Sequence, residues 1–430
     1  MSINRKRKYP KRANNFTLSS TDVKFRRTTL DNGIKILTEE VPSVSSFALG
    51  ISINTGSRDD WQGYFGLAHF LEHAGYRHTH KRTSRQIASL FERLGAYTNA
   101  FTTKELTCFY VRALKPNFKK TLELITDVAL FPIFIEEEIE KEKLIILDEI
   151  KSYYDDPEEY IFDLGEDILF TGNGLAHPIT GIEADVEKIT PVELFNFHKE
   201  QYVPDNIIFS IAGNINHDFA VEKISRLLEN YQFRNRELKR DVPINNPAKR
   251  ESIEANFQQS HLLMFSRVSG VDSNERYSLA ALNVLLGDGM SSRLYRQLRE
   301  NHGLAYNIYS NAQLMTDCGG LFIYAGTEKK HLKKSERLIF KEMGNIINSR
   351  ISNVDMIRIK EQLKSSTIMA LESMSTRMQS LAKSEFSLGY YEDMQETITK
   401  IDDLTIDDIK EVAIKYLKPD DWNVLTLISE

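Results

Sequence analysis

The chain has 430 residues, of which 41% are hydrophobic and 27% charged, and its formal net charge is −6. This length exceeds one ordinary hydrophobic core, so two domains are expected. No run of 18 or more apolar residues occurs, which excludes a helical membrane span. The two cysteines, Cys108 and Cys318, exclude a disulfide framework and indicate a reducing compartment.

The charge is unevenly distributed along the chain. Residues 1–30 hold nine Lys or Arg against one acid, Asp22, so the remainder is strongly acidic. We expect residues 1–24 to form a flexible basic tail that lacks the apolar segment of a secretory signal. The predicted location is cytoplasmic. The mitochondrial matrix is the alternative, because the basic, acid-poor tail meets part of the pattern of an organelle-targeting presequence. An acidic body without a recognition motif also argues against nucleic-acid binding.

The first half predicts alternating strands and helices. Asp31 to Gly33 is a hairpin signal between two short strands, and Gly95 ends a helix that Thr83 or Ser84 caps. Pro157, Gly172, Gly174 and Pro178 indicate turns after residue 155. Strands are expected within 24–38, 47–54, 106–112 and 207–212, and helices at 66–74, 84–94, 117–130, 136–154, 191–200 and 217–231.

The second half repeats the first at an offset of about 214 residues. Residues 107–111 (TCFYV) and 117–120 (NFKK) recur as 320–324 (GLFIY) and 331–334 (HLKK). We therefore predict an α+β fold of two homologous domains, 25–231 and 253–430, joined by a linker at 232–252. Each domain is expected to be a mostly antiparallel sheet packed against helices.

A helical segment carries the candidate chemistry. His69 and His73 are four residues apart and project from one helix face, with Glu72 beside them. Two imidazoles on successive turns can hold one zinc ion, and catalytic zinc sites usually take three protein ligands. Glu72 can then take a proton from a water molecule whose pKa the ion lowers. This His-x-x-Glu-His order is the inverse of the common zinc-protease motif.

The third ligand is expected on the helix at 136–154. Glu142 and Glu149 are seven residues apart and share one face of that helix. The spacing allows either carboxylate to reach the ion. The internal repeat puts Asn283, Leu286 and Gly287 at the positions of His69, Glu72 and His73, and Leu363 near the position of Glu149. None of these four side chains is a usual zinc ligand, so the second domain is predicted to hold no metal.

Several motifs resemble the pitrilysin/insulinase family of zinc metallopeptidases, which includes mitochondrial processing peptidases and their bacterial relatives. They are 66–73 (GLAHFLEH), 99–105 (NAFTTKE), 155–160 (DDPEEY), 177–181 (HPITG), 289–294 (GMSSRL) and 298–306 (LRENHGLAY). The resemblance covers residues 25 to the end. It departs from the family at 74–79 (AGYRHT), where relatives carry a Met- or Phe-Lys-Gly-Thr stretch, and this difference affects the expected substrate pockets.

The resemblance implies a role for each motif. It implies that His69, His73 and Glu149 bind one Zn²⁺ per chain, that Glu72 is the general base and that Glu142 supports the ligands. Other implied residues are Asn99, Ala100 and Phe101, which would pair with the substrate main chain, and Arg299 and Tyr306, which would hold the substrate carbonyl.

The resemblance also implies half of a clamshell. Arg299 and Tyr306 would then come from a facing subunit, in a homodimer or a heterodimer with a related subunit. The expected function is a zinc endopeptidase acting on peptides or unfolded segments. The alternative is a non-catalytic or weakly catalytic subunit of a heterodimeric processing peptidase, or a structural core-protein-like subunit.

Overall fold

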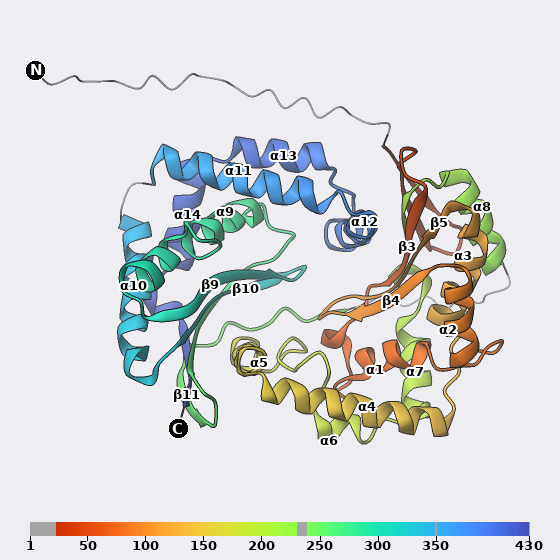
Figure 1. The fold of residues 1–430 in the computed structure, drawn as a ribbon, viewed down its shortest axis with the longest axis horizontal. Helices are drawn as coiled ribbons and strands as arrows, with labels where there is room; N and C mark the ends of the chain where they lie inside the picture. Colours follow the sequence, from red (N-terminus) through yellow and green to blue (C-terminus); the bar gives the residue numbers. More distant parts are fainter. Residues whose placement is uncertain (1–22, 230–238, 349–350, 430) are drawn as a thin grey trace, which may run out of the picture.

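A computed structural model describes residues 23–229, 239–348 and 351–429, and Figure 1 shows two sheets flanked by helices. In the described residues the first sheet has the order β1-β2-β6-β3-β5-β4, and the second has the order β7-β11-β8-β10-β9. The strands of the first sheet are β1 (Lys24–Thr29), β2 (Lys35–Glu40), β3 (Ser46–Ile53), β4 (Tyr97–Thr102), β5 (Thr107–Leu114) and β6 (Ile207–Gly213). Those of the second are β7 (Arg250–Ala255), β8 (Ser260–Ser269), β9 (Ala305–Leu314), β10 (Cys318–Thr327) and β11 (Asn423–Ser429).

The two sheets share one topology. The order β2-β6-β3-β5-β4 in the first sheet matches β7-β11-β8-β10-β9 in the second, strand for strand. Within these five-strand units β2 runs parallel to β6 and β7 parallel to β11, while the other neighbouring strands are antiparallel. The predicted α+β duplication with mostly antiparallel sheets is therefore confirmed.

Helices follow the same division. The first half contains α1 (Leu67–Gly75), α2 (Ser84–Arg93), α3 (Phe118–Leu130), α4 (Glu136–Asp155), α5 (Pro157–Leu169), α6 (Glu183–Val186), α7 (Pro191–Gln201) and α8 (His217–Leu228). The second contains α9 (Arg276–Leu286), α10 (Leu332–Asn348), α11 (Asn353–Ala370), α12 (Met374–Leu388), α13 (Met394–Asp403) and α14 (Ile406–Tyr416). None of the helices in the described ranges is long and apolar enough to cross a membrane.

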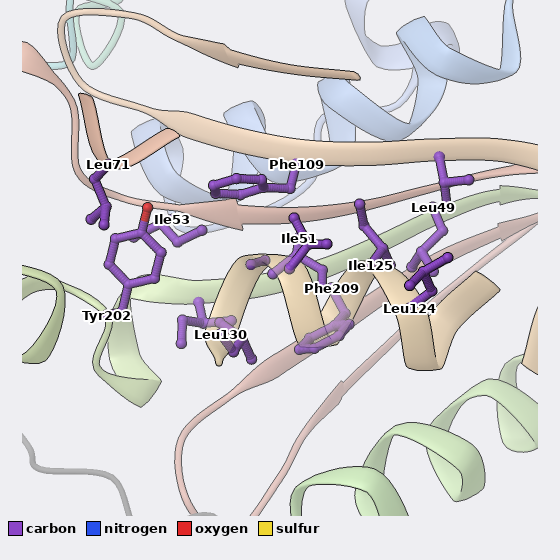
Figure 2. Packing of buried hydrophobic residues seen from close by; sticks show 14 of the residues in the cluster. Leu49, Ile51, Ile53, Leu71, Phe109, Leu124, Ile125, Leu130, Tyr202 and Phe209 are labelled. Carbon is purple, nitrogen blue, oxygen red and sulfur yellow. The ribbon is translucent and has the colours of Figure 1, made fainter. Parts of the chain in front are cut away.

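The core of the first half lies between its sheet and helices α1 and α3. Figure 2 shows Leu49, Ile51 and Phe209 from the strands packed against Leu124 and Ile125 of α3. These side chains are almost completely buried, which removes their apolar surface from water and fixes α3 against the sheet. The same cluster includes the apolar face of α1, so the position of α1 is set by this core.

One helix of each half packs against the sheet of the other half. Helix α5 of the first half packs on strands β8 and β11 of the second sheet, and α12 packs on β2, β3 and β6 of the first sheet (Figure 1). Leu169 of α5 belongs to a buried cluster with Leu263 and Phe265, whereas Leu381 of α12 is buried with Ile208. Since α5 and α12 occupy corresponding positions in the repeat, the exchange is symmetric.

Buried ion pairs join the halves at the hairpin tips. Arg58 pairs with Glu105, in the β4–β5 turn, and with Asp317, in the β9–β10 turn. Arg240, which precedes β7, reaches back to Asp59. The side chain of Arg58 is only 2% exposed, so these charges lie inside the junction and hold the two halves in one arrangement.

The structure differs from the sequence prediction at α5. The sequence indicates a turn at Pro157, but this residue occupies the first turn of α5, where its missing N–H costs nothing. Asp156 caps the helix by accepting hydrogen bonds from the backbone N–H groups of Glu158 and Glu159. A helix therefore occupies Pro157–Leu169, where no element was predicted.

The predicted linker also ends earlier than expected. Strand β7 begins at Arg250, inside the predicted range 232–252, because it pairs with β11 at the far end of the chain. The tail up to residue 22 and the linker residues 232–238 lie outside the described residues. The domain division at 25–231 and 253–430 remains a prediction, and the exchanged helices α5 and α12 cross it.

Candidate metal centre

Helix α1 begins at a sharp turn that its sequence requires. Gly66 precedes the helix with φ +102°, and a side chain there would meet the carbonyl oxygen of Thr180 at 2.7 Å. The carboxylate of the half-buried Asp60 accepts hydrogen bonds from the N–H groups of Gly66 (2.7 Å) and Ala68 (2.8 Å). These contacts satisfy N–H groups at the helix start and fix its direction.

One face of α1 enters the core and the other faces α4. Leu67, Phe70 and Leu71 are at most 1% exposed, whereas His69 and His73 point the other way, with their ring centroids 4.6 Å apart. On α4, Glu149 brings its Oε1 to 3.9 Å from His69 Nε2 and its Oε2 to 3.8 Å from His73 Nε2. The three ligand atoms all lie within 4.8 Å of one another.

This donor set fits a zinc ion. Two imidazole nitrogens and one carboxylate form a common catalytic zinc set, and bonds of about 2.0–2.2 Å in a tetrahedral site place ligand atoms roughly 3.3 Å apart. The observed separations of 3.8 and 3.9 Å differ from this by an amount that side-chain rotation covers. Burial, followed by the influence of His73, lowers the pKa of His69 to about 3, which keeps its ring neutral as a metal ligand must be.

Glu142 lies on the opposite side of His73. Its Oε1 is 2.8 Å from Nδ1 of His73, and its other oxygen forms an ion pair with Arg77. A carboxylate on Nδ1 favours the tautomer that leaves Nε2 free for a metal. The sequence left Glu142 and Glu149 open as third ligands, and in the structure it is Glu149 that lies beside both Nε2 atoms.

Glu72 lies in the same wall of the site. Its Oε2 accepts a hydrogen bond of 2.6 Å from the hydroxyl of Thr102, the last residue of β4. Burial raises the pKa of Glu72, and the Thr102 hydrogen bond acts in the opposite direction without cancelling the rise. The pKa of His73 is also raised: burial opposes the charged ring, but the Glu142 hydrogen bond and nearby carboxylates outweigh it. A carboxyl group with a raised pKa is suited to exchanging a proton near neutral pH.

These residues open onto a cavity of about 1030 Å³ between the two halves. Phe101 and Thr102 of β4 line it next to His69, Glu72 and His73, and β4 is the edge strand of its sheet. Asn99, Ala100 and Phe101 pair with Tyr110, Phe109 and Cys108 of β5, so the other edge of β4 is not used within the first sheet. An extended peptide can add to such an edge by main-chain hydrogen bonds.

The lining of the cavity also contains acidic residues to which the sequence analysis assigns no role. Glu158, Glu159, Asp163 and Glu166 all lie on α5 and line the cavity. Burial and the neighbouring Glu166 raise the pKa of Asp163 to about 7, and Glu166 pairs with Lys104 at 2.8 Å. The spacing of three or four residues between Glu159, Asp163 and Glu166 is a helical signal, but it went unused because no helix was predicted there.

Arg299 and Tyr306 lie elsewhere in the second half. Arg299 is in a short π-helix (Tyr295–Asn301), and its guanidinium carbon is 5.4 Å from the ring centroid of Tyr306. Tyr306 is 76% exposed. Both residues are in the described part of the chain, and neither lines the cavity that contains His69 and Glu149. Within one chain the structure therefore keeps this pair apart from the candidate metal centre.

The matching position in the second half is closed. Asn283, at the position of His69, accepts a hydrogen bond of 2.7 Å from the hydroxyl of Ser310. Gly287, at the position of His73, packs so tightly that an added Cβ would lie 2.4 Å from the backbone nitrogen of Ser310. Ser310 of β9 thus packs against both residues that the repeat places opposite the two histidines.

Comparison with known proteins agrees with this arrangement. Residues 35–182 match the family model described as insulinase (peptidase family M16), and residues 188–363 match the model described as the peptidase M16 inactive domain. The chain is 32% identical over 405 residues to an uncharacterized zinc protease, YmxG, of Bacillus subtilis, covering 94% of this chain and 98% of that protein. A second uncharacterized zinc protease, from Mycobacterium leprae, is 31% identical over 395 residues, covering 91% of this chain and 89% of that protein.

Two solved structures share the fold. A protease from Helicobacter pylori superposes with a TM-score of 0.88 at 20% identity, covering 94% of this chain and 99% of that chain. A structure from Pseudomonas fluorescens described as a peptidase M16 inactive domain also gives 0.88, at 19% identity and with 95% and 98% covered. The duplicated fold, the sequence similarity over nearly the whole chain and the family models place this chain in the M16 (insulinase) family of zinc proteases.

Proposed function

We propose that the chain is a zinc-dependent endopeptidase that cleaves peptides or unfolded polypeptide segments. The observation that carries the proposal is the convergence of His69, His73 and Glu149 within 4.8 Å, at a cavity of about 1030 Å³ that Glu72 also lines. In this proposal these three residues hold one Zn²⁺ per chain, and Glu142 orients His73. When bound there, zinc lowers the pKa of water and polarises the carbonyl to be cleaved.

The residues of the chain supply the proton transfers and the orientation. Glu72 takes a proton from the attacking water and returns it to the amine that leaves. The free edge of β4 at Asn99, Ala100 and Phe101 pairs with the main chain of the substrate, which suits an enzyme that accepts many sequences. The acidic wall on α5 favours peptides with basic side chains.

The proposal includes a second subunit. Arg299 and Tyr306 can donate hydrogen bonds to the oxyanion that develops on the substrate carbonyl, but in this chain they do not line the cavity. We therefore infer a dimeric chamber, formed by two copies or by one copy and a related subunit, in which the facing chain supplies this pair. A cytoplasmic location belongs to the same proposal, since Cys108 and Cys318 are both unpaired and buried.

The test is hydrolysis of a mixed peptide library by the purified chain, with and without a chelator. We expect cleavage that the chelator abolishes and added Zn²⁺ restores. In parallel, Glu72→Gln replaces the carboxylate by a carboxamide of nearly the same shape and removes the base, so we expect zinc to stay bound while cleavage is lost. Loss of zinc together with activity in this variant would make Glu72 a ligand instead.

The same experiment separates the enzyme from its alternative, a subunit that keeps the fold without turnover. A chain that binds zinc but cleaves no peptide, alone or with a related subunit, would support the non-catalytic role. A chain that binds no zinc after careful purification would contradict the proposed metal centre itself.

A further inference from the structure

Two parallel hydrogen bonds join strand β4 to helix α1. The hydroxyl of Thr102 donates to Oε2 of Glu72 at 2.6 Å, and the hydroxyl of Thr98 lies 2.9 Å from the hydroxyl of Tyr76. Thr98 and Thr102 are four residues apart and therefore face the same side of the strand, whereas Tyr76 directly follows α1, four residues after Glu72. The strand and the helix are thus connected at two points, only one of which involves the proposed base.

The carboxylate of Glu72 depends on such a contact for its orientation. A glutamate side chain has several rotatable bonds, and a short hydrogen bond to one oxygen restricts the plane of the carboxylate and leaves the other oxygen directed elsewhere. A base that shifts by about 1 Å can lose roughly two orders of magnitude in rate. Thr102 is half-buried at the end of β4, which pairs with β5 along its whole length.

The strand also links the base to the substrate. Thr102 directly follows Asn99, Ala100 and Phe101, the part of edge strand β4 that is the proposed site of peptide pairing. Phe101 and Thr102 both line the cavity, and the backbone N–H of Ala100 donates to Oδ1 of Asn99 (2.9 Å), a local bond that a paired peptide would replace. A peptide added to this edge therefore lies in a fixed position relative to the hydroxyl that holds Glu72.

We propose that Thr102 is a positioning residue, which orients the carboxylate of Glu72 toward a substrate bound on the adjacent edge of β4. This inference rests on the proposed peptidase function. Thr102 acts through Glu72 and exchanges no proton with the substrate. The role belongs to its hydroxyl group, and the methyl group only packs.

A crossed pair of substitutions separates these two parts of the side chain. Thr102→Val keeps the shape and loses the hydroxyl, whereas Thr102→Ser keeps the hydroxyl and loses the methyl group. Thr98→Val is the matched control, because it removes a hydroxyl from the same face of the strand that contacts the hydroxyl of Tyr76 and donates to the carbonyl oxygen of Tyr110, and not Glu72. The measurements are kcat and KM on a peptide that the wild-type chain cleaves, together with bound zinc and thermal unfolding for each variant.

We expect Thr102→Val to lower kcat by about 10- to 100-fold with KM and zinc content unchanged. Thr102→Ser should remain within a few-fold of wild type, and Thr98→Val should keep the wild-type kcat. The proposal is overturned if Thr102→Val retains full kcat, if Thr102→Ser falls as far as Thr102→Val, or if Thr98→Val falls equally.

Failure of the proposed function gives a different result. A wild-type chain that binds zinc and cleaves no peptide removes the reaction itself, and this inference with it. If the wild-type chain cleaves peptides and Thr102→Val cleaves them equally fast, only the role of Thr102 is overturned and the peptidase function stands.

Discussion

Three glutamates surround the two histidines of the candidate metal centre, and their surroundings assign them different tasks. Glu142 is 4% exposed and lies between His73 and Arg77, so it is held as a permanent hydrogen-bond acceptor. Glu149 has a 34% exposed side chain and lies beside both Nε2 atoms, where it is free to move toward an ion. Glu72 has a raised pKa and faces the cavity, which suits proton transfer.

The sequence predicts part of this arrangement. Helical spacing alone indicates that His69, Glu72 and His73 share a face, because these residues are within one turn of each other. It does not distinguish Glu142 from Glu149, since the choice depends on how α4 is rotated and shifted against α1. The contact of Thr102 with Glu72 is also hidden, because strand and helix meet only through the tertiary fold.

At the scale of elements, the exchange of α5 and α12 makes the two halves depend on each other. Leu381 of α12 is fully buried against Leu37 and Ile208 of the first sheet. We expect Leu381→Ala to lower the free energy of unfolding by about 2–5 kcal/mol, because the truncation leaves a cavity in a packed interface. The two tryptophans report the halves separately, since Trp61 lies in the first and Trp422 in the second.

Denaturant unfolding checks this prediction. It is followed by tryptophan fluorescence in two single-tryptophan proteins, one that keeps Trp61 and one that keeps Trp422. If the halves are interlocked, both probes unfold in one transition and Leu381→Ala moves them together. A shift at Trp61 with Trp422 unaffected would show two independent units. The control is Met369→Ala on α11, which is 61% exposed and should change stability by less than about 0.5 kcal/mol.

The sequence predicts most elements of this fold, but it does not predict the exchange. The hairpin at Gly33, the helix containing His69 and the internal repeat all follow from local patterns, and the structure contains them. Helix α5 was missed because Pro157 resembles a turn residue as much as a helix start. Its packing on the distant sheet depends on contacts more than 90 residues apart, such as Gly165 with Leu263, which local periodicity does not encode.

At the scale of the whole molecule, one chain holds two parts of the proposed reaction centre in separate places. The candidate metal ligands and Glu72 line the cavity, whereas Arg299 and the 76% exposed Tyr306 lie outside it. A homodimer that shares sites predicts complementation between Glu72→Gln, which loses cleavage, and Tyr306→Phe, which lowers turnover. When Glu72→Gln and Tyr306→Phe chains are dissociated, mixed and re-associated, each mixed dimer contains one site with both Glu72 and Tyr306 intact.

We expect the mixture to recover about a quarter of wild-type turnover, because half of randomly formed dimers are mixed and each carries one complete site of two. The measurement is the peptidase rate of the mixture relative to each variant alone. A rate equal to the average of the two separate variants, in a chain that is dimeric in solution, would show that Tyr306 does not act across a homodimer.

The account depends most directly on the metal ion held by His69, His73 and Glu149. The measurement is the zinc content of the purified full-length chain after dialysis, compared with that of Glu149→Gln. We predict about one zinc per wild-type chain and a large loss in the variant, since an amide is a poor substitute for a carboxylate ligand. Wild-type chain without zinc, or equal zinc in the two proteins, would contradict the proposed centre.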